Sequence, residues 1–293
     1  VHSALAFTVP CSDLTGQAVG GASAAVLNVM EKLTPAGGVL TVRDCVINDT
    51  TPTFSFAPAV NWTGPVLLEF VNMTVTDSAG LSLISQDGTL ANVHVLLRDS
   101  FVNLSAFGSV SSSFLSWSYI VTAFNVSITF ENTWCSIVLK DDAFATGSIG
   151  CLDTKSSRGS RRSNQILLSA VNSTISLFHH GRGVGCMLSV TSFLTLQDVS
   201  IVAVNSTLMA SATSSLSVAS ILCSDALVSV EDIHMLSQQS NISSIGGLGT
   251  VAALALVGNQ QSMNISLKRA VISVTNGVVE AAGPRLRGLL LNC

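Results

Sequence analysis

Apolar and polar residues alternate along most of this chain in short runs, a pattern typical of half-buried β-strands. Clear examples begin at Leu40 (LTVRDCVI), Leu194 (LTLQDVSI) and Val228 (VSVEDIHM). Similar runs begin at Val66, Val95, Ile128, Ile166 and Ile265. Because the apolar positions do not follow the i, i+3, i+4, i+7 spacing of a helix, the pattern predicts a chain of short strands.

A second recurring segment places small residues before an apolar run, as in GVGCML and VASILC. Its reference positions recur 33 to 35 residues apart, at Leu83, Ser116, Cys151, Cys186, Ile221, Leu256 and Leu290. Helical repeats of about this length, such as TPR and ankyrin, require a helical apolar period that is missing here. A propeller blade requires about four strands and more aromatic residues than the 5% of this chain.

The pattern therefore predicts an all-β fold, a right-handed parallel β-helix of about eight coils with about 34 residues each. Equivalent strands would stack from coil to coil, so that apolar side chains form ladders inside the solenoid. Residues 18–33 are predicted to form an amphipathic capping helix over the open edge of the first coil. We expect residues 1–39 to form an N-terminal arm with this helix, and residues 40–293 to form a β-helix that continues past the last residue.

The amino-acid composition and the net charge exclude several classes of protein. Charged residues make up 10% of the chain and hydrophobic residues 48%, and the net charge is −4. This hydrophobicity excludes a disordered chain, and the lack of a basic surplus argues against a nucleic-acid partner. No apolar run approaches the length of about 18 residues that a membrane helix needs, so any membrane anchor is expected beyond the C-terminal end.

Glycosylation sequons are in excess. Nine of the sixteen asparagines stand in Asn-x-Ser/Thr, whereas 66 Ser and Thr in 293 residues predict 16 × 66/293, between three and four. The nine are Asn48, Asn61, Asn72, Asn103, Asn125, Asn172, Asn205, Asn241 and Asn264. This excess predicts a secreted or cell-surface glycoprotein. The alternative is that Asn, Ser and Thr are simply turn-forming residues.

The seven cysteines contain no CxxC pair, which argues against a zinc ribbon or a thioredoxin-type site. Cys11 and Cys45 are predicted to join the N-terminal arm to the first coil. Cys151 and Cys186 share one coil position in the 34-residue alignment, where adjacent coils would bring them within disulfide range. Two alternatives stay open, a stack of reduced thiols and a Cys135–Cys151 bridge.

Catalytic candidates are few. Asp141 and Asp142 precede His179 and His180 by about one coil, so these four residues form the best candidate for a polysaccharide hydrolase or lyase. The alternative is that the aspartate pair and the histidine pair each lie in a solvent-exposed loop and have no catalytic role. Acidic residues near strand ends could stack into a Ca²⁺ site or face solvent: Asp44, Glu69, Asp99, Glu131, Asp198 and Asp232. We expect neither a resident metal nor a cofactor.

Two resemblances add to these expectations. The predicted helix, the Gly37-Gly38 turn and the first strand resemble the entry of pectin-lyase-like β-helix proteins. Recurring phrases such as LTLQDVSI at Leu194, VNST at Val204 and VSVEDIH at Val228 resemble the dispersed gene family surface proteins of kinetoplastid protozoa. This resemblance implies a non-enzymatic surface glycoprotein that serves adhesion or recognition, with host or matrix glycans or proteins as partners. The alternative is a pectin-lyase-like enzyme that cleaves polysaccharides.

Overall fold

The computed structural model consists of strands and turns, with no helix in the residues it describes. The described residues are 5–10, 37–47, 54–56, 65–76, 81–84, 89–106, 112–118, 122–139, 145–153, 162–180, 183–191, 195–212, 217–224, 229–246, 250–252 and 266–282. All strand pairs in this part of the chain are parallel, and the strands form three sheets.

Sheet A is the longest of the three, with nine strands. They are β1 (Leu5–Pro10), β2 (Gly38–Arg43), β5 (Val66–Val71), β8 (Thr89–Arg98), β11 (Thr122–Glu131), β14 (Arg162–Val171), β17 (Thr195–Val204), β20 (Ser229–Gln238) and β23 (Ser266–Thr275). They stack in chain order, so that β1 and β23 are the two edges of the sheet.

Sheet B has eight strands and sheet C has seven. Sheet B contains β3 (Val46–Ile47), β6 (Thr74–Thr76), β9 (Phe101–Ala106), β12 (Trp134–Leu139), β15 (Thr174–His179), β18 (Thr207–Ala212), β21 (Asn241–Gly246) and β24 (Val278–Ala282). Sheet C contains β4 (Phe54–Phe56), β7 (Leu81–Ile84), β10 (Ser112–Ser118), β13 (Ala145–Asp153), β16 (Gly183–Thr191), β19 (Ser217–Ser224) and β22 (Thr250–Ala252).

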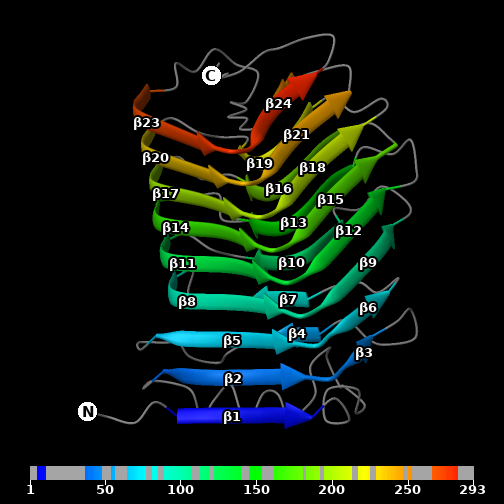
Figure 1. Ribbon diagram of the computed structural model, residues 1–293. Helices are drawn as coiled ribbons and strands as arrows, with labels where there is room; N and C mark the ends of the chain where they lie inside the picture. Colours follow the sequence, from blue (N-terminus) through cyan, green and yellow to red (C-terminus); the bar gives the residue numbers. More distant parts are fainter. Residues whose placement is uncertain are drawn as a thin grey trace.

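From β2 onward the chain visits the sheets in rotation, A then B then C, and each visit adds one strand beside the strand of the preceding unit. Figure 1 shows the resulting stack, with β1 at one end and β23 and β24 at the other. We call one strand from each sheet, in chain order, a unit. Because equivalent strands lie side by side, a residue in one unit has a partner at the same position of the next unit.

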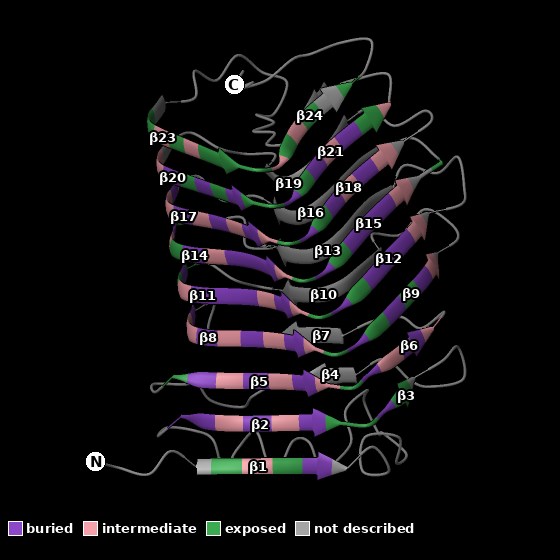
Figure 2. Ribbon diagram, in the orientation of Figure 1, coloured by how far each residue is buried: buried purple, intermediate pink, exposed green. Residues whose placement is uncertain are grey.

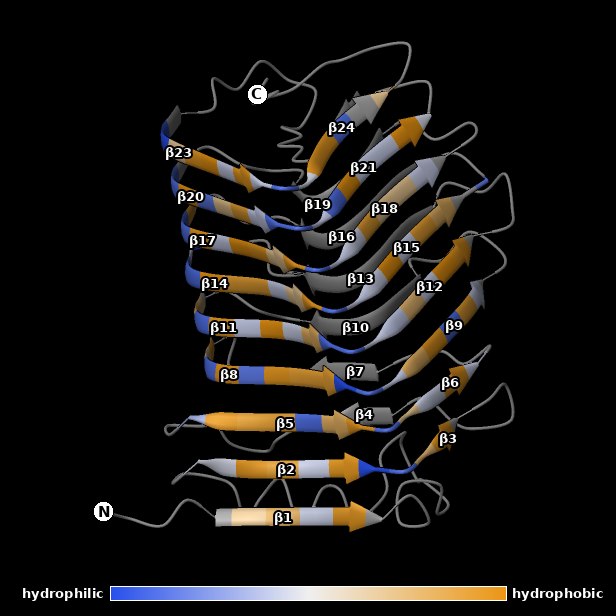
Figure 3. Ribbon diagram, viewed as in Figure 1, coloured by the Kyte–Doolittle hydropathy of each residue, from blue (hydrophilic) through white to orange (hydrophobic). Residues whose placement is uncertain are grey.

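The core lies between the sheets and consists of stacked columns of apolar residues. One column of sheet A runs Leu40, Leu68, Val95, Ile128, Leu168, Ile201 and Met235, each at most 6% exposed. Figure 2 shows buried positions alternating with more exposed ones along these strands, and Figure 3 shows the matching alternation of hydropathy. The parallel all-β architecture expected from the period-two pattern is confirmed.

The domain boundary and the spacing of the units differ from expectation. The predicted boundary at residue 39 falls inside β2, and β1 of the supposed N-terminal arm already pairs with β2 in sheet A. The predicted helix at 18–33 lies outside the described residues. Units are also unequal in length, since equivalent turn residues in sequence order are separated by 27 residues (Asn72 to Asp99) up to 40 (Asn132 to Asn172).

Candidate functional site

The turn from sheet A to sheet B carries the most regular polar feature of the molecule. One residue in each unit adopts a left-handed conformation there, with φ between 48° and 57°. We call these residues the turn column: Asp44, Asn72, Asp99, Asn132, Asn172, Asn205, Gln239 and Asn276. Asn and Asp occupy this conformation with less strain than other non-glycine residues, which explains why seven of the eight are Asn or Asp.

Backbone hydrogen bonds continue through the turn column from one unit to the next. The N–H of Asn172, for example, donates to the carbonyl of Val204 at 2.9 Å, and that of Asn132 donates to Val171 at 3.0 Å. The column therefore stacks without interrupting the backbone ladder of sheets A and B. Such continuity satisfies the polar groups of a turn that would otherwise break the sheet.

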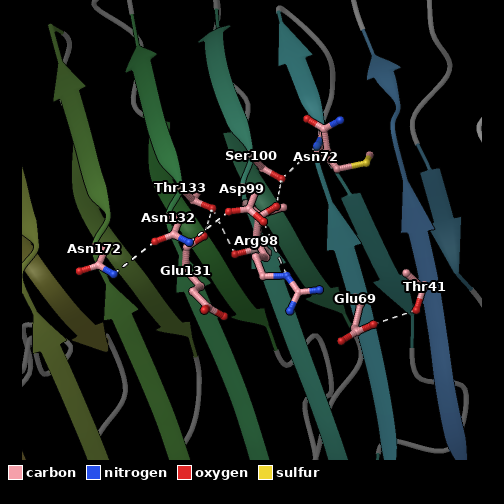
Figure 4. Close-up of polar contacts among 12 residues, drawn as sticks. Thr41, Glu69, Asn72, Arg98, Asp99, Ser100, Glu131, Asn132, Thr133 and Asn172 are labelled. Carbon is pink, nitrogen blue, oxygen red and sulfur yellow. Dashed lines mark hydrogen bonds and ion pairs between the residues drawn. The ribbon is translucent and has the colours of Figure 1, made fainter.

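Side chains in the turn column are linked as well (Figure 4). The amide of Asn205 donates to Oδ1 of Asn172 at 3.3 Å, and the amide of Asn172 donates to Oδ1 of Asn132 at 3.3 Å. Asn132 donates in turn to Asp99 at 3.1 Å, and Asn72 donates to Asp44 at 2.8 Å. These exposed contacts join the side chains from Asn205 to Asp99 in one series and join Asn72 to Asp44 in a separate pair.

A buried column follows directly after the turn column, with a hydroxyl in five successive units: Ser100, Thr133, Ser173, Ser206 and Ser240. Each hydroxyl donates to the carbonyl two residues earlier, as Ser206 does to Val204 at 2.8 Å. The four serine hydroxyls also accept from a backbone N–H of the preceding unit, as Ser206 does from Ser173 at 3.1 Å, whereas the Thr133 hydroxyl donates to the Leu97 carbonyl as well. The serine hydroxyls therefore give buried backbone N–H groups an acceptor and add a second donor to carbonyls that already belong to the backbone ladder.

The hydroxyl column ends at Gly277. A β-carbon there would lie 2.3 Å from the carbonyl oxygen of Ser240, which already accepts from the N–H of Val278 at 3.0 Å. No side chain fits this position without movement of the backbone. The last unit of the described chain thus keeps the turn but not the hydroxyl.

A second left-handed column lies within sheet A, near the start of its long strands. Its members are Asn92, Asn125, Gln165, Asp198, Asp232 and Arg269, with φ between 50° and 57°. Each is left out of the strand pairing at the same position of six successive strands, and the register is the same on both sides of it. We call this set the bulge column. Four of the six members are Asn or Asp, which suit the left-handed conformation for the same reason as in the turn column, and Gln165 and Arg269 are the exceptions.

Charge in the bulge column gathers at its C-terminal end. The Arg269 guanidinium makes two hydrogen bonds to the Asp232 carboxylate, and its Nη2 lies 3.6 Å from Oε1 of Glu231. Lys268 Nζ lies 3.8 Å from the same Glu231 oxygen. The hydrogen bond from Arg269 lowers the pKa of Asp232 and raises the pKa of Arg269 itself. The two basic side chains are exposed and the two carboxylates are half-buried, and together they form an ion-pair cluster.

The strand-end acids do not form one column. Asp44 and Asp99 belong to the turn column, and Asp198 and Asp232 belong to the bulge column. Glu69 lies opposite Thr41, whose hydroxyl donates to it at 2.8 Å, and Glu131 lies opposite Arg98. The pKa of Asp44 is lowered, chiefly by the hydrogen bond from Asn72. Within the described residues, no three His, Cys, Asp or Glu side chains gather in a metal-binding group.

The described sequons fall into two groups. Asn72, Asn172 and Asn205 stand in the turn column, and Asn125 stands in the bulge column, where its amide donates to Asn92 at 2.9 Å. The amide nitrogens of all four donate to side chains of neighbouring units. Three of these asparagines therefore belong to tight structural turns, and the threonine of each sequon, two residues later, begins the next strand of sheet B.

The second group consists of Asn103 on β9 and Asn241 on β21. Both side chains are exposed on the outer face of sheet B, and neither stands in a left-handed column. Glycosylation at these two asparagines would leave both ladders intact. The other three sequons, Asn48, Asn61 and Asn264, lie outside the described residues.

An exposed aromatic pair lies beside the turn column on sheet B. Phe101 and Trp134 are strand partners on β9 and β12, with ring centroids 4.6 Å apart and planes 9° from parallel. They are 42% and 37% exposed. Asp99 and Asn132 of the turn column precede them by two residues, so a stacked apolar pair and polar groups share one surface region. Phe124, which is 40% exposed, lies on sheet A instead.

The structure describes only the histidines of the predicted catalytic group. His179 ends β15 and pairs with Leu139, the last residue of β12, so the last residues of these two strands lie side by side. His180 is exposed. Asp141 and Asp142 lie outside the described residues. The structure therefore brings the ends of the two strands together without defining a catalytic geometry.

The expected Cys151–Cys186 pairing is wrong. Cys151 lies opposite Ser189, and Cys186 lies opposite Ser148, three residues away along the strand. That offset separates the two α-carbons by about 10 Å along the strand direction, beyond disulfide range. The 34-residue alignment failed here because the true offset between β13 and β16 is 38 residues.

The remaining cysteine predictions have mixed outcomes. Cys135 is a fully buried free thiol inside sheet B, so the Cys135–Cys151 alternative is also excluded, and burial raises the pKa of this thiol. Cys45 is buried at the first turn. Its predicted partner Cys11 lies outside the described residues.

Sequence reasoning missed the two left-handed columns as structural features. The signal for the turn column was present, because Asn or Asp is followed by Ser or Thr in four of its units, at Asp99, Asn132, Asn172 and Asn205. Asn172 and Asn205 carry the signal of sequons and Asp99 that of an acidic strand end, whereas Asn132 carries neither. Their unequal spacing hid them from a search for one fixed period.

A scan with protein-family models, a search of curated proteins and a search of solved structures each find no match to this chain. Among the described residues, no helix is long and apolar enough to span a membrane.

Proposed function

We propose that the chain is a right-handed parallel β-helix, with a capping helix at residues 18–33, that serves as a rigid scaffold of an extracellular or cell-surface glycoprotein. The A–B–C rotation of parallel strands supports the solenoid. A right-handed crossover between parallel strands is by far the commoner hand, which supports the handedness. The scaffold presents its outer faces to glycans or proteins of a host or matrix.

The observation that carries this proposal is the placement of Asn103 and Asn241. Both sequons face outward and are exposed on one face of a regular stack. N-linked glycans at these positions require no change in the ladders that hold the units together. The sequon excess and the resemblance to kinetoplastid surface proteins point in the same direction.

The proposed recognition surface centres on Phe101 and Trp134. Aromatic side chains are enriched at binding sites because they offer a large contact area at little entropic cost. The exposed turn-column groups of Asp99 and Asn132 provide hydrogen-bonding partners beside them. A ligand with both apolar and hydroxyl-rich surfaces, such as a glycan, fits this combination.

The test uses the 293-residue chain secreted from a eukaryotic host. Binding to arrays of glycans and matrix proteins is measured for the wild-type protein, for Trp134→Ala and for Phe124→Ala, a matched exposed aromatic on sheet A. The proposal predicts that Trp134→Ala weakens binding at least tenfold and that Phe124→Ala does not. Equal binding by all three proteins, or none by a folded wild-type sample, would contradict it.

A second candidate function is polysaccharide cleavage by a pectin-lyase-like enzyme. The observation that favours it is the pairing of Leu139 with His179, which places the last residues of β12 and β15 side by side, two residues before Asp141 in the sequence. A screen for new reducing ends and unsaturated products, with and without Ca²⁺, tests this function. Cleavage that disappears in both Asp141→Asn and His180→Ala would establish it over the scaffold.

A further inference from the structure

Each ring of the exposed aromatic pair on sheet B covers one face of the other. Phe101 and Trp134 stand opposite each other on β9 and β12, with ring centroids 4.6 Å apart and planes 9° from parallel. Because neighbouring strands are spaced about 4.8 Å apart, the two rings stack directly across the strands. Phe101 therefore covers one face of the Trp134 indole, and the opposite face points toward β15, the next strand of the sheet.

The indole face that points toward β15 lies beside short polar side chains. The strand partner of Trp134 on β15 is Thr174, and Thr207 follows on β18, the next strand in the stack (Figure 1). Both threonines are exposed. The next outward residues of β12 and β15 are the partners Ser136 and Ser176. Because these side chains are much shorter than an indole, they leave its β15 side uncovered, and Trp134 is 37% exposed.

The phenyl side of the pair is less suited to a ligand. The free face of Phe101 points toward β6, where its strand partner Thr74 is half-buried. The turn-column residue ahead of this ring is the carboxylate Asp99, whereas β15 and β18 are preceded by the amides Asn172 and Asn205. The indole side of the pair is therefore the more open and the less charged of the two.

The surface beside the indole carries no charge in the part that the structure describes. The outward side chains described on β12, β15 and β18 are all Trp, Ser, Val, Thr, Phe or Met. Acidic sugars present a carboxylate or a sulfate, and proteins bind these groups chiefly through Arg and Lys. An uncharged ligand suits this surface better than an acidic one, because burying an unpaired charge is costly.

We propose that the β15 side of Trp134 binds one uncharged hexopyranose residue of a glycan. A hexopyranose has a face of C–H groups, and stacking this face on the indole buries apolar surface of both. The hydroxyls on the rim of the sugar then lie above Thr174 and Thr207, whose own hydroxyls can donate and accept. Phe101 does not touch the sugar and supports the indole from behind. This assignment deepens the recognition function proposed above and rests on it.

The test measures binding of three small probes by NMR titration: methyl β-glucopyranoside, methyl β-galactopyranoside and the charged methyl β-glucuronide. It uses the secreted 293-residue chain after enzymatic removal of its N-glycans. We expect at least one uncharged glycoside to bind, and the glucuronide to bind more weakly than the glucopyranoside. Thr174→Leu places an aliphatic chain against the indole and removes a hydroxyl, so binding should weaken about tenfold or more. Thr74→Leu, beside Phe101, is the matched control and should bind as the wild-type protein does.

Saturation transfer on the wild-type protein keeps the proposal testable if Thr174→Leu fails to fold. Transfer from indole protons should be strongest at the C–H protons of one face of the bound pyranose, and it should be lost in Trp134→Ala. Equal binding by the wild-type protein and Thr174→Leu, weaker binding by Thr74→Leu alone, a preference for the glucuronide, or no binding of either uncharged glycoside would overturn this assignment. The recognition function would survive each of these results if array binding still depends on Trp134, so the two failures are distinguishable.

Discussion

The side-chain amide of Asn205 donates a hydrogen bond to the amide oxygen of Asn172, 33 positions earlier in the chain and one unit away in space, at 3.3 Å. Both residues hold the left-handed conformation, at φ 48° and 49°. The contact links two turns that fold the chain from sheet A into sheet B. It also shows that an asparagine in a sequon has a structural role here.

Replacing Asn172 tests the turn column. Asn172→Ala loses both ladder hydrogen bonds and forces an alanine into the left-handed region, which costs about 1–2 kcal/mol by itself. We expect a decrease of about 1–3 kcal/mol in the free energy of unfolding, measured with urea on unglycosylated protein. Asn172→Gly keeps the conformation accessible and is expected to lose less. Equal losses in the two variants would exclude backbone strain as the cause.

Ser206→Ala tests the hydroxyl column. It removes the acceptor of the Ser173 N–H and the donor to the Val204 carbonyl. Because these groups are buried, we expect a loss of about 1–3 kcal/mol in unfolding free energy. Ser206→Thr is the matched control, since Thr133 occupies the same column and its hydroxyl donates to the carbonyl two residues earlier. An alanine variant as stable as the threonine variant would rule out this role for the hydroxyl.

For the secreted protein proposed above, the position of each sequon inside or outside the left-handed columns predicts whether it carries a glycan. We expect glycans at Asn103 and Asn241, which are exposed and outside the ladders. Occupancy at Asn172 and Asn205 is expected to be much lower, because their amides donate to neighbouring turns. Peptide mass spectrometry after enzymatic deglycosylation in ¹⁸O water measures each site. Full occupancy at Asn172 together with empty Asn103 would be the opposite result.

Stability should decrease in acid because of Asp232. Its folded pKa lies below the ordinary value of 3.8, owing mainly to the hydrogen bond from Arg269. The unfolded chain therefore binds a proton first as pH falls, so this contribution is present above pH 4 and is lost progressively below it. Urea midpoints between pH 7 and pH 3 should decrease less steeply in Asp232→Asn than in the wild-type protein. Parallel pH profiles would show that this pair contributes nothing measurable.

The strand content was predictable because it depends on local alternation. Runs such as those at Leu40 and Val228 contain the apolar residues that the structure buries in sheet A, and their parallel stacking follows from repetition without helical connections. A single-sequence pattern is informative here because each strand alternates between a buried and a more exposed face.

The register was not predictable from a fixed period. Connections between strands differ in length, so the unit lengths vary while the stacked positions stay aligned. Ser116 and Cys151 are strand partners as the 34-residue alignment implied, but Cys151 and Cys186 are not. The turn column is the better marker of register, because left-handed Asn or Asp recurs in every unit except one.

Engineered disulfides measure the register directly, and every interpretation of the columns depends on it. Thr174 and Thr207 are exposed partners on β15 and β18, so cysteines at both positions should form a disulfide under mild oxidation of the folded protein. Cysteines at Thr174 and Met209, two residues out of register, should not. The account predicts a cross-linked peptide for the first pair alone, identified by mass spectrometry. Cross-linking of the second pair instead, or equal cross-linking of both, would contradict the stacked arrangement.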